Sequence, residues 1–336
     1  MKGRRHWQAP LHQNGLTLIE LMVSLTIGLI VAMAIFSAYL GASGAGKMSD
    51  AQSRMNEDAQ AALLILSQQL KMAGNNPDQP DRIDNIDASL SSRRNPVYGT
   101  TTFVTGPFTT SDFSIRGCDG QFSNVTSAPT LNALDCPSGA SSWPDSIAIN
   151  YEADRFNTIP TSQASGKWPT DCVGKKLAVT AANLPKVAGT GAVNETVTYS
   201  VAENRFYIGT SVSPDSTSLY CKGNGEASTP QALVENVEDM QITYGASSAA
   251  PHSATIAGYL RADELAALST VPNSPTPWAQ VISVRICVLV RSEEPVVSSN
   301  APARYLNCDG ALVMNPPDRR LRQAYFSTVV LRNRRL

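Results

Sequence analysis

Residues 15–40 read GLTLIELMVSLTIGLIVAMAIFSAYL, and the rest of the chain is organised around this stretch. Glu20 is the only charged side chain between Leu16 and Leu40. The apolar run exceeds the ~20 residues with which a helix crosses the hydrocarbon core of a bilayer. It is also longer than the roughly 7–15 apolar residues of a cleaved secretory signal. We therefore expect residues 16–40 to form a membrane-spanning helix.

A short basic leader, residues 1–15, precedes the apolar run. It holds Lys2, Arg4 and Arg5 and no acidic residue. Basic residues that flank a membrane helix tend to stay on the cytoplasmic side. The sequence therefore predicts a single membrane pass, with a cytoplasmic amino terminus and an exported remainder.

The junction from Gly15 through Glu20 resembles the class III signal of type IV prepilins. Three later stretches resemble the ectodomain of PilW-type minor pilins, namely LVENVEDMQITYG (233–245), WAQVISVRICVLVRS (278–292) and RRLRQAYFSTVVLRNRR (319–335). The resemblance implies that prepilin peptidase cleaves after Gly15 and methylates the new amino terminus at Leu16. It also implies an α+β pilin-like fold, in which a long amino-terminal helix packs on an antiparallel β-sheet.

Glu20 needs an explanation because a carboxylate inside a membrane costs on the order of 2.5–3.5 kcal/mol even on lenient insertion scales. The resemblance implies that Glu20 contacts the cationic amino terminus, at Leu16, of a neighbouring subunit. In another interpretation, Glu20 reaches the nearby cytoplasmic face or caps its own helix. The junction before it favours the assembly contact.

The resemblance also implies a function and its partners. The protein would join other minor pilins and the major pilin, prime type IV pilus assembly and support twitching motility and adhesion. It would move from the inner membrane to the pilus and cell surface, and could stay at the pilus tip with an adhesin. A minor pseudopilin of a type II secretion system shares the same leader and helix. A membrane-anchored periplasmic enzyme or binding protein is the competing class.

Charge and histidine content bear on these alternatives. The chain has 27 basic and 28 acidic residues, so removal of the three basic residues of the leader leaves 24 against 28. This balance gives no overall positive electrostatic field that would attract a polyanion.

His6 and His12 lie in the leader, which leaves His252 as the one histidine of the processed chain. A multi-histidine zinc site is excluded, and Ser-His-Asp catalysis would rest on one loop residue. We predict that the protein is not an enzyme and binds no cofactor or metal. Catalysis by a pair of carboxylates is an alternative that the sequence leaves open.

All six cysteines follow the apolar run, as expected for disulfides in an oxidising periplasm. No Cys-x-x-Cys pair suggests a metal site instead. Six cysteines allow about 15 complete pairings, so connectivity is open, and we favour neighbours in sequence. These pairs are Cys118–Cys136, Cys172–Cys221 and Cys287–Cys308.

Helical periodicity returns after a glycine-rich patch at residues 41–46, where we expect bending or local melting of the helix. The patch imitates a phosphate-binding loop, but Met48 replaces the required hydroxyl residue, so nucleotide binding is rejected. An amphipathic stem helix is predicted to end at Gly74. We therefore expect four parts of the chain: the leader (1–15), the membrane helix (16–40), the stem helix (41–74) and a β-rich domain (75–336). Its apolar stripe consists of Met48, Ala51, Met55, Ala59, Ala62, Leu66, Leu70 and Ala73.

The part of the chain after an acidic linker (75–95) is predicted to be rich in β-strands. Residues 202–204 are predicted to form the turn of a hairpin between 196–201 and 205–210, and 258–268 a short helix. The other expected strands are 98–105, 146–151, 218–222, 231–237, 239–244, 281–291 and 323–332.

Arginines dominate the carboxyl end. This pattern predicts a solvated edge that resists aggregation, while nucleic-acid binding is an unlikely role because no recognised module accompanies the charges. The basic residues are Arg319, Arg320, Arg322, Arg332, Arg334 and Arg335.

Overall fold

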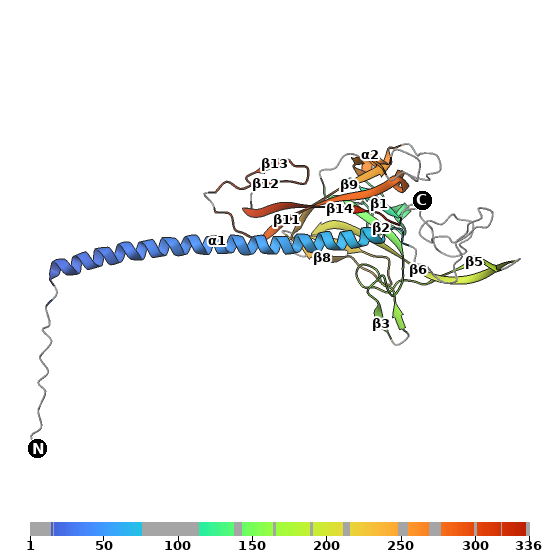
Figure 1. Cartoon of the computed structure of the whole chain (residues 1–336), viewed down its shortest axis with the longest axis horizontal. Coiled ribbons are helices and arrows are strands. Elements are labelled where there is room, and N and C mark those ends of the chain that lie inside the picture. Colours follow the sequence, from blue (N-terminus) through green and yellow to red (C-terminus); the bar gives the residue numbers. More distant parts are fainter. Residues whose placement is uncertain are drawn as a thin grey trace, which may run out of the picture. The chain divides into compact units, whose positions relative to one another are not determined.

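The structure, a computed structural model, divides into two compact units between Asp50 and Ala51. A long helix, α1 (Leu18–Met72), contributes to both units, and all the strands that the structure describes belong to the second unit (Figure 1). The residues that the structure describes are 15, 17–75, 114–137, 143–163, 166–188, 191–210, 216–247, 255–268, 277–298, 301–316 and 318–333. The predicted strand at 98–105 and most of the acidic linker lie outside these residues.

Helix α1 is unbroken from Leu18 to Met72. The glycine-rich patch at 41–46 is helical throughout, so the local melting predicted there is wrong. Each glycine costs only about 1 kcal/mol relative to alanine, and good helix formers on both sides of the patch offset that penalty. The space around the patch is open, because a Cβ added to Gly41, Gly44 or Gly46 would meet nothing within 4 Å.

The predicted stripe is buried from Met55 onward, whereas Met48 is exposed. Helix α1 ends where the glycine stop was expected, because Gly74 adopts a positive φ of 70°, a conformation that suits glycine. The chain then joins the sheet beside it, since Gly74 N–H donates to the carbonyl of Asn150 at 2.9 Å. The buried helical residues are Met55, Ala59, Ala62, Leu66 and Leu70.

The first sheet is antiparallel and has the order β1-β2-β6-β7-β8, with β5 paired to β6 outside this path. Its central strand β6 is 20 residues long, so its first half pairs with β5 and its second half with β2. The strands are β1 (Ile115–Cys118), β2 (Ser146–Ala153), β5 (Thr180–Ala188), β6 (Gly191–Thr210), β7 (Thr217–Lys222) and β8 (Gln231–Glu235).

The second sheet is also antiparallel, in the order β10-β9-β11-β14. Its strands are β9 (Val237–Ser247), β10 (Ile256–Leu260), β11 (Val281–Pro295) and β14 (Arg320–Val330). The remaining elements are β3 (Thr161–Gln163), β4 (Gly166–Trp168), α2 (Ala262–Ala266), β12 (Arg304–Leu306), β13 (Leu312–Met314) and the 3-10 turns η2 (Leu131–Ala133) and η3 (Pro277–Gln280). The α+β fold predicted from the sequence is confirmed.

Polar contacts fasten the second half of α1 to both sheets. Asn204 of β6 donates to Gln69 at 2.8 Å, and Asn333 after β14 donates to the carbonyl of Lys71 at 2.9 Å. Apolar side chains from the helix and both sheets share one core. Alternate residues of β11 belong to this core, namely Val284, Ile286, Val288 and Val290.

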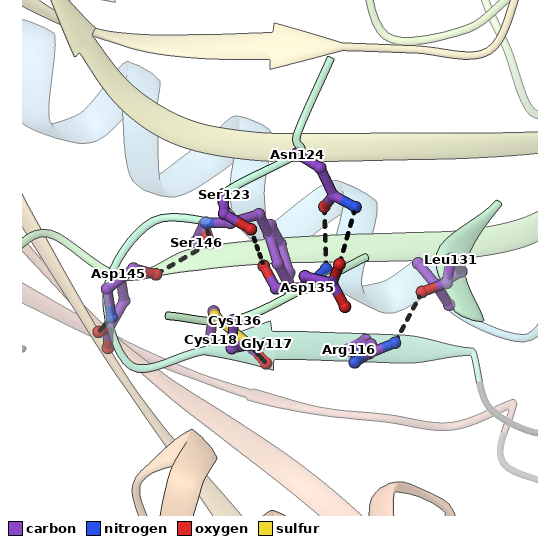
Figure 2. Close-up of a disulfide and its surroundings, with 12 residues drawn as sticks. Arg116, Gly117, Cys118, Ser123, Asn124, Leu131, Asp135, Cys136, Asp145 and Ser146 are labelled. Carbon is purple, nitrogen blue, oxygen red and sulfur yellow. Dashed lines mark hydrogen bonds between the residues drawn. A yellow bond between two sulfur atoms is a disulfide. The ribbon is translucent and has the colours of Figure 1, made fainter. Parts of the chain in front are cut away.

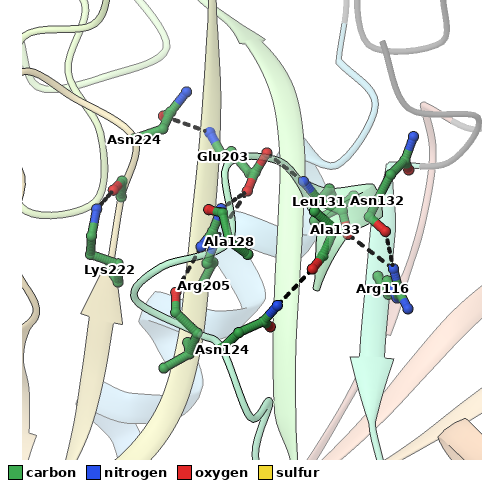
Figure 3. Close-up of polar contacts among 12 residues, drawn as sticks. Arg116, Asn124, Ala128, Leu131, Asn132, Ala133, Glu203, Arg205, Lys222 and Asn224 are labelled. Atoms are coloured by element: carbon green, nitrogen blue, oxygen red, sulfur yellow. Dashed lines mark hydrogen bonds and ion pairs between the residues drawn. The ribbon is translucent and has the colours of Figure 1, made fainter. Parts of the chain in front are cut away.

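The hairpin turn predicted at residues 202–204 is wrong, because β6 runs straight through it. Polar residues there suggested a turn, but Glu203 and Asn204 are buried and bonded. Glu203 pairs with Arg205 of the same strand (Figure 3), while Asn204 points to the opposite face, toward α1. The helix predicted over 258–268 is also shorter than expected, since β10 takes its first residues and α2 covers only Ala262–Ala266.

Three disulfides, Cys118–Cys136, Cys172–Cys221 and Cys287–Cys308, pair the cysteines as sequence neighbours. The first closes the loop between β1 and β2 (Figure 2). Within that loop Asn124 donates to the carbonyl of Ala133 at 2.7 Å and accepts from Asp135 N–H at 2.8 Å. The loop is therefore held by its own hydrogen bonds as well as by the disulfide.

Candidate functional site

The amino end of α1 is capped by Thr17, whose hydroxyl oxygen accepts a hydrogen bond from the Glu20 N–H at 3.3 Å. Thr17 also accepts the first helical bond through its carbonyl, from Leu21 N–H at 3.1 Å. A threonine three residues before a glutamate is the pattern of a helix-capping box. This local chemistry starts the helix directly after the predicted cleavage junction.

The large apolar side chains of α1 from Leu18 to Leu40 are all between 51% and 77% exposed. Exposed apolar surface of this extent requires cover by lipid or by other protein. By length and composition, α1 is the one helix among the described residues that can cross a membrane. The hydroxyls within it suit that environment, because Ser24, Thr26 and Ser37 each donate to a backbone carbonyl of the helix itself.

Glu20 lies in the first turn of α1 and its side chain is exposed. Its backbone N–H is satisfied by Thr17, but no described residue donates to or pairs with its carboxylate. The negative charge is favourable at the amino end of a helix, where the unpaired N–H groups carry partial positive charge. The carboxylate thus remains open to a group supplied from outside the described residues.

Gly15 has open space around it, since a Cβ added there would meet no atom within 4 Å. Its φ also lies outside the positive range that favours glycine. Neither packing nor backbone strain within the described chain therefore requires glycine at this position. Leu16, the predicted methylation site, lies outside the described residues.

Two comparisons with protein families match the chain. Residues 11–36, which include the junction and the first part of α1, match the prokaryotic N-terminal methylation motif. Residues 205–333 match type IV pilus-assembly protein W. Together the two matches support a type IV minor pilin of the PilW family. Comparisons with curated proteins and with solved structures found no match.

The PilW match begins within β6 and extends past β14, so it includes the whole second sheet. The three stretches whose resemblance was recognised in the sequence contribute to this sheet. Stretch 233–245 forms most of β9, 278–292 forms most of β11, and 319–335 contains β14. The match to type IV pilus-assembly protein W thus includes β9, β11 and β14, three adjacent strands of one sheet.

The arginines at the start of β14 are paired, so the solvated edge predicted for them is wrong. The Arg322 side chain is only 6% exposed and bonds to both Glu238 and Asp318. Arg320 lies 3.8 Å from Asp318, and Arg319 donates to the carbonyls of Val297 and Ala301. Arg332 is exposed, whereas Arg334 and Arg335 lie outside the described residues.

A buried carboxylate that could not be recognised from the sequence joins the two sheets. Asp145, 4% exposed, precedes β2. It accepts hydrogen bonds from Gly120 N–H at 3.0 Å and Ile242 N–H at 2.7 Å. Burial raises the pKa of Asp145 to about 7, with a further contribution from the charge of Asp119. Asp145 thus links the β1–β2 loop to β9 of the second sheet.

Asp145 and Asp318 give opposite dependences of stability on pH. Because the folded pKa of Asp145 lies above its ordinary value, folding takes up a proton, and stability falls as pH rises from about 4 to 7, by up to about 1.4 kcal/mol per pH unit. The hydrogen bond from Arg322 lowers the pKa of Asp318 to about 2, so the contribution of Asp318 to stability is lost only below about pH 4.

We expect maximal stability near pH 4 in urea unfolding of the detergent-solubilised protein. Asp145→Asn should flatten the slope between pH 4 and 7, and an unchanged slope would contradict this assignment.

Among the described residues, no three histidine, cysteine, aspartate or glutamate side chains gather in a way that could hold a metal ion. The six cysteines are bound in disulfides and offer no thiolate. The features that point to function are therefore the exposed apolar helix, its cap and the single acid in its first turn.

Proposed function

We propose that this PilW-family protein is a minor pilin that acts with other minor pilins and the major pilin to prime type IV pilus assembly. In this role it remains at the pilus tip beside an adhesin and supports twitching motility and adhesion. The observation that carries the proposal is the fully exposed apolar segment of α1, which holds one acid, Glu20, directly behind the Gly15–Leu16 junction. Such a segment can exchange lipid for neighbouring subunits without refolding.

Prepilin peptidase is the first partner of this pathway. It cleaves between Gly15 and Leu16 and methylates Leu16, which leaves the helix of residues 16–40 in the inner membrane. The leader, residues 1–15, is cytoplasmic, residues 41–74 form the stem, and residues 75–336 form the periplasmic domain that later reaches the cell surface. The match to the N-terminal methylation motif supports this order of events.

Glu20 provides the assembly contact. After cleavage the amino group on Leu16 is a cation at the edge of an apolar surface, four residues before the Glu20 carboxylate of its own chain. Across two adjacent subunits the cation of one chain and the carboxylate of the other neutralise each other in a medium of low dielectric constant. The bond from Glu20 N–H to Thr17 supports this assignment, because capping of the helix leaves the carboxylate available. The role requires no catalysis by the chain itself.

Replacing Glu20 by valine tests the proposal. Glu20→Val protein should still insert in the membrane and lose its leader, because valine is at least as apolar as the surrounding residues. Its incorporation into sheared pili should fall at least about tenfold, since the partner amino group would then be buried without a counter-ion. Immunoblots of membrane and pilus fractions measure both quantities.

Glu57→Val is the matched control, because Glu57 is an exposed acid of α1 beyond the apolar segment. It should be incorporated like the natural protein. Normal piliation with Glu20→Val protein present in the fibres would contradict the proposed contact. Deletion of the gene separates the pilus from a type II secretion pseudopilus, because the first predicts loss of twitching and the second predicts loss of protein secretion.

A further inference from the structure

Strand β14 lies at one side of the second sheet, because among the described strands it pairs only with β11. The other side of that sheet ends in β10, which has five residues and an irregular register with β9. Short or irregular strands discourage further strands from pairing with them. β14 has 11 residues, so its edge is the longer of the two.

The hydrogen-bond pattern shows which backbone groups of β14 point away from β11. The two strands keep one continuous register from Arg322 to Val330 of β14. Just beyond it, Leu331 N–H donates to the Ile282 carbonyl at 2.8 Å, so the odd-numbered residues of β14 direct their backbone groups to β11. In an antiparallel pair this direction alternates from one residue to the next. The backbone groups that point away from β11 therefore belong to Ala324, Phe326, Thr328 and Val330.

Residues 323–330 of β14 lack the features that usually protect the edge of a sheet. Their sequence, QAYFSTVV, contains no charged residue and no proline, and no bulge interrupts their register with β11. The preceding Arg322 does not protect the edge either, because its side chain is 6% exposed and is paired with Glu238 and Asp318. Charges, prolines and bulges are the means by which proteins keep another strand from adding to an open edge. The edge of β14 is therefore competent to accept a strand.

The chemistry of this edge specifies what can cover it. A row of backbone N–H and C=O groups is matched by the backbone of another extended chain, whereas lipid acyl chains offer neither donors nor acceptors. Phe326 and Val330 are 60% and 55% exposed on one face of β14, where the side chains of an added strand can pack against them. The opposite face is occupied, since the Tyr325 hydroxyl donates to Asn56 of α1 at 2.5 Å. The absence of charge at 323–330 favours an uncharged strand.

We propose that the edge of β14 at residues 324–330 binds an uncharged, extended strand of a neighbouring minor pilin. The added strand lengthens the second sheet across the boundary between the two subunits. The contact differs from the one assigned to Glu20, because it uses backbone groups of the strand-containing unit. This inference rests on the proposed function, which supplies other minor pilins as neighbours.

Hydrogen exchange of single backbone N–H groups tests the strand addition in the full-length protein. The detergent-solubilised protein is compared alone and after co-purification with the other minor pilins, and mass spectrometry with electron-transfer fragmentation resolves each N–H. In the protein alone, the N–H groups of Ala324, Phe326, Thr328 and Val330 should exchange rapidly, while those of the odd-numbered residues between them are protected. In the complex, the even-numbered groups should exchange at least about tenfold more slowly, because a hydrogen-bonded N–H exchanges only when the strand opens.

Thr328→Pro tests the same edge without removing a bond to β11, because the N–H that proline lacks points away from that strand. The variant should keep the Cys287–Cys308 bridge, which joins β11 to the β12–β13 hairpin. It should recover at least about tenfold less of the other minor pilins, since the proline ring also obstructs the edge. Thr328→Val is the matched control, because it keeps the N–H and is also β-branched. It should recover the other minor pilins fully.

The outcomes separate this inference from the proposed function. Rapid exchange of the even-numbered N–H groups in an intact complex, or an intact complex with Thr328→Pro, would overturn the strand addition and leave the minor-pilin role in place. Slow exchange in the protein alone would also overturn it, because the edge would then be covered by its own chain or by a second copy. If no other minor pilin co-purifies, the proposed function and this inference fail together.

Discussion

Replacing Gly15 by leucine is expected to leave the fifteen-residue leader attached, so that the precursor becomes the main species in the membrane. We expect this effect to arise in the processing enzyme, because Gly15 has open space around it and lacks a positive φ, so nothing within the described chain requires glycine there. A side chain at this position therefore leaves α1 undisturbed and interferes only with the enzyme that must bring its catalytic groups to the peptide bond. Gly15→Ala should give an intermediate result, because a methyl group is the smallest obstruction.

Gly28→Ala is the matched control for this experiment. Gly28 also has open space around it, but it lies within the apolar segment of α1 and away from the junction. The control protein should be processed completely. Mass spectrometry of the amino terminus distinguishes the two outcomes in both variants, since processed protein should begin with methylated Leu16 and the precursor with the leader. A Gly15→Leu protein that begins at Leu16 would contradict the assigned cleavage site.

Features that arise from local chemistry could be predicted from the sequence. The stripe of Met55, Ala59 and Leu66 identified the buried face of α1, because helical spacing alone places these residues on one side. The stop at Gly74 followed from the conformational freedom of glycine. The three disulfides join cysteines that are neighbours in sequence, so the simplest assumption about their pairing agreed with the structure.

Features that arise from tertiary contacts could not be predicted. Glu203 and Asn204 are typical turn residues, and only the elements packed on both faces of β6 make them strand residues. The arginines of β14 looked like a solvated edge because their partner Glu238 is 84 positions away from Arg322 in the sequence. Asp145 gave no signal either, since its two donors are backbone N–H groups that any residue could supply.

The candidate site differs from these cases because its proposed partners belong to other molecules. The sequence pointed to Gly15, Leu16 and Glu20 through resemblance to prepilins, and no packing within one chain brings a second group to the Glu20 carboxylate in the described residues. The structure contributes the open space at Gly15, the cap on Thr17 and the uncovered helix. Each is a property that a site completed by another protein needs.

Removing the guanidinium of Arg205 is expected to destabilise the domain by about 3–5 kcal/mol, because it leaves a buried carboxylate without its counter-ion. Glu203 and Arg205 are 8% and 4% exposed, and the Arg205 Nε donates to the carboxylate of Glu203 at 2.9 Å (Figure 3). The same guanidinium donates to the carbonyls of Val125 and Ala128. Arg205→Ala therefore also releases the loop between β1 and β2. Urea unfolding of the detergent-solubilised protein measures the loss.

Arg54→Ala provides the comparison, since its ion pair with Glu293 is 72% and 64% exposed and should contribute less than about 1 kcal/mol. Equal losses of unfolding free energy in the two variants would contradict the importance of burial.

The loss of unfolding free energy in Arg205→Ala should also depend on pH. Burial already raises the pKa of Glu203 although Arg205 opposes the shift, and removal of Arg205 raises it further. The carboxyl of the variant can then become neutral by binding a proton, so the destabilisation should be smaller at pH 5 than at pH 8. Glu203→Leu combined with Arg205→Met removes both charges and should be less destabilising at pH 8 than Arg205→Ala alone.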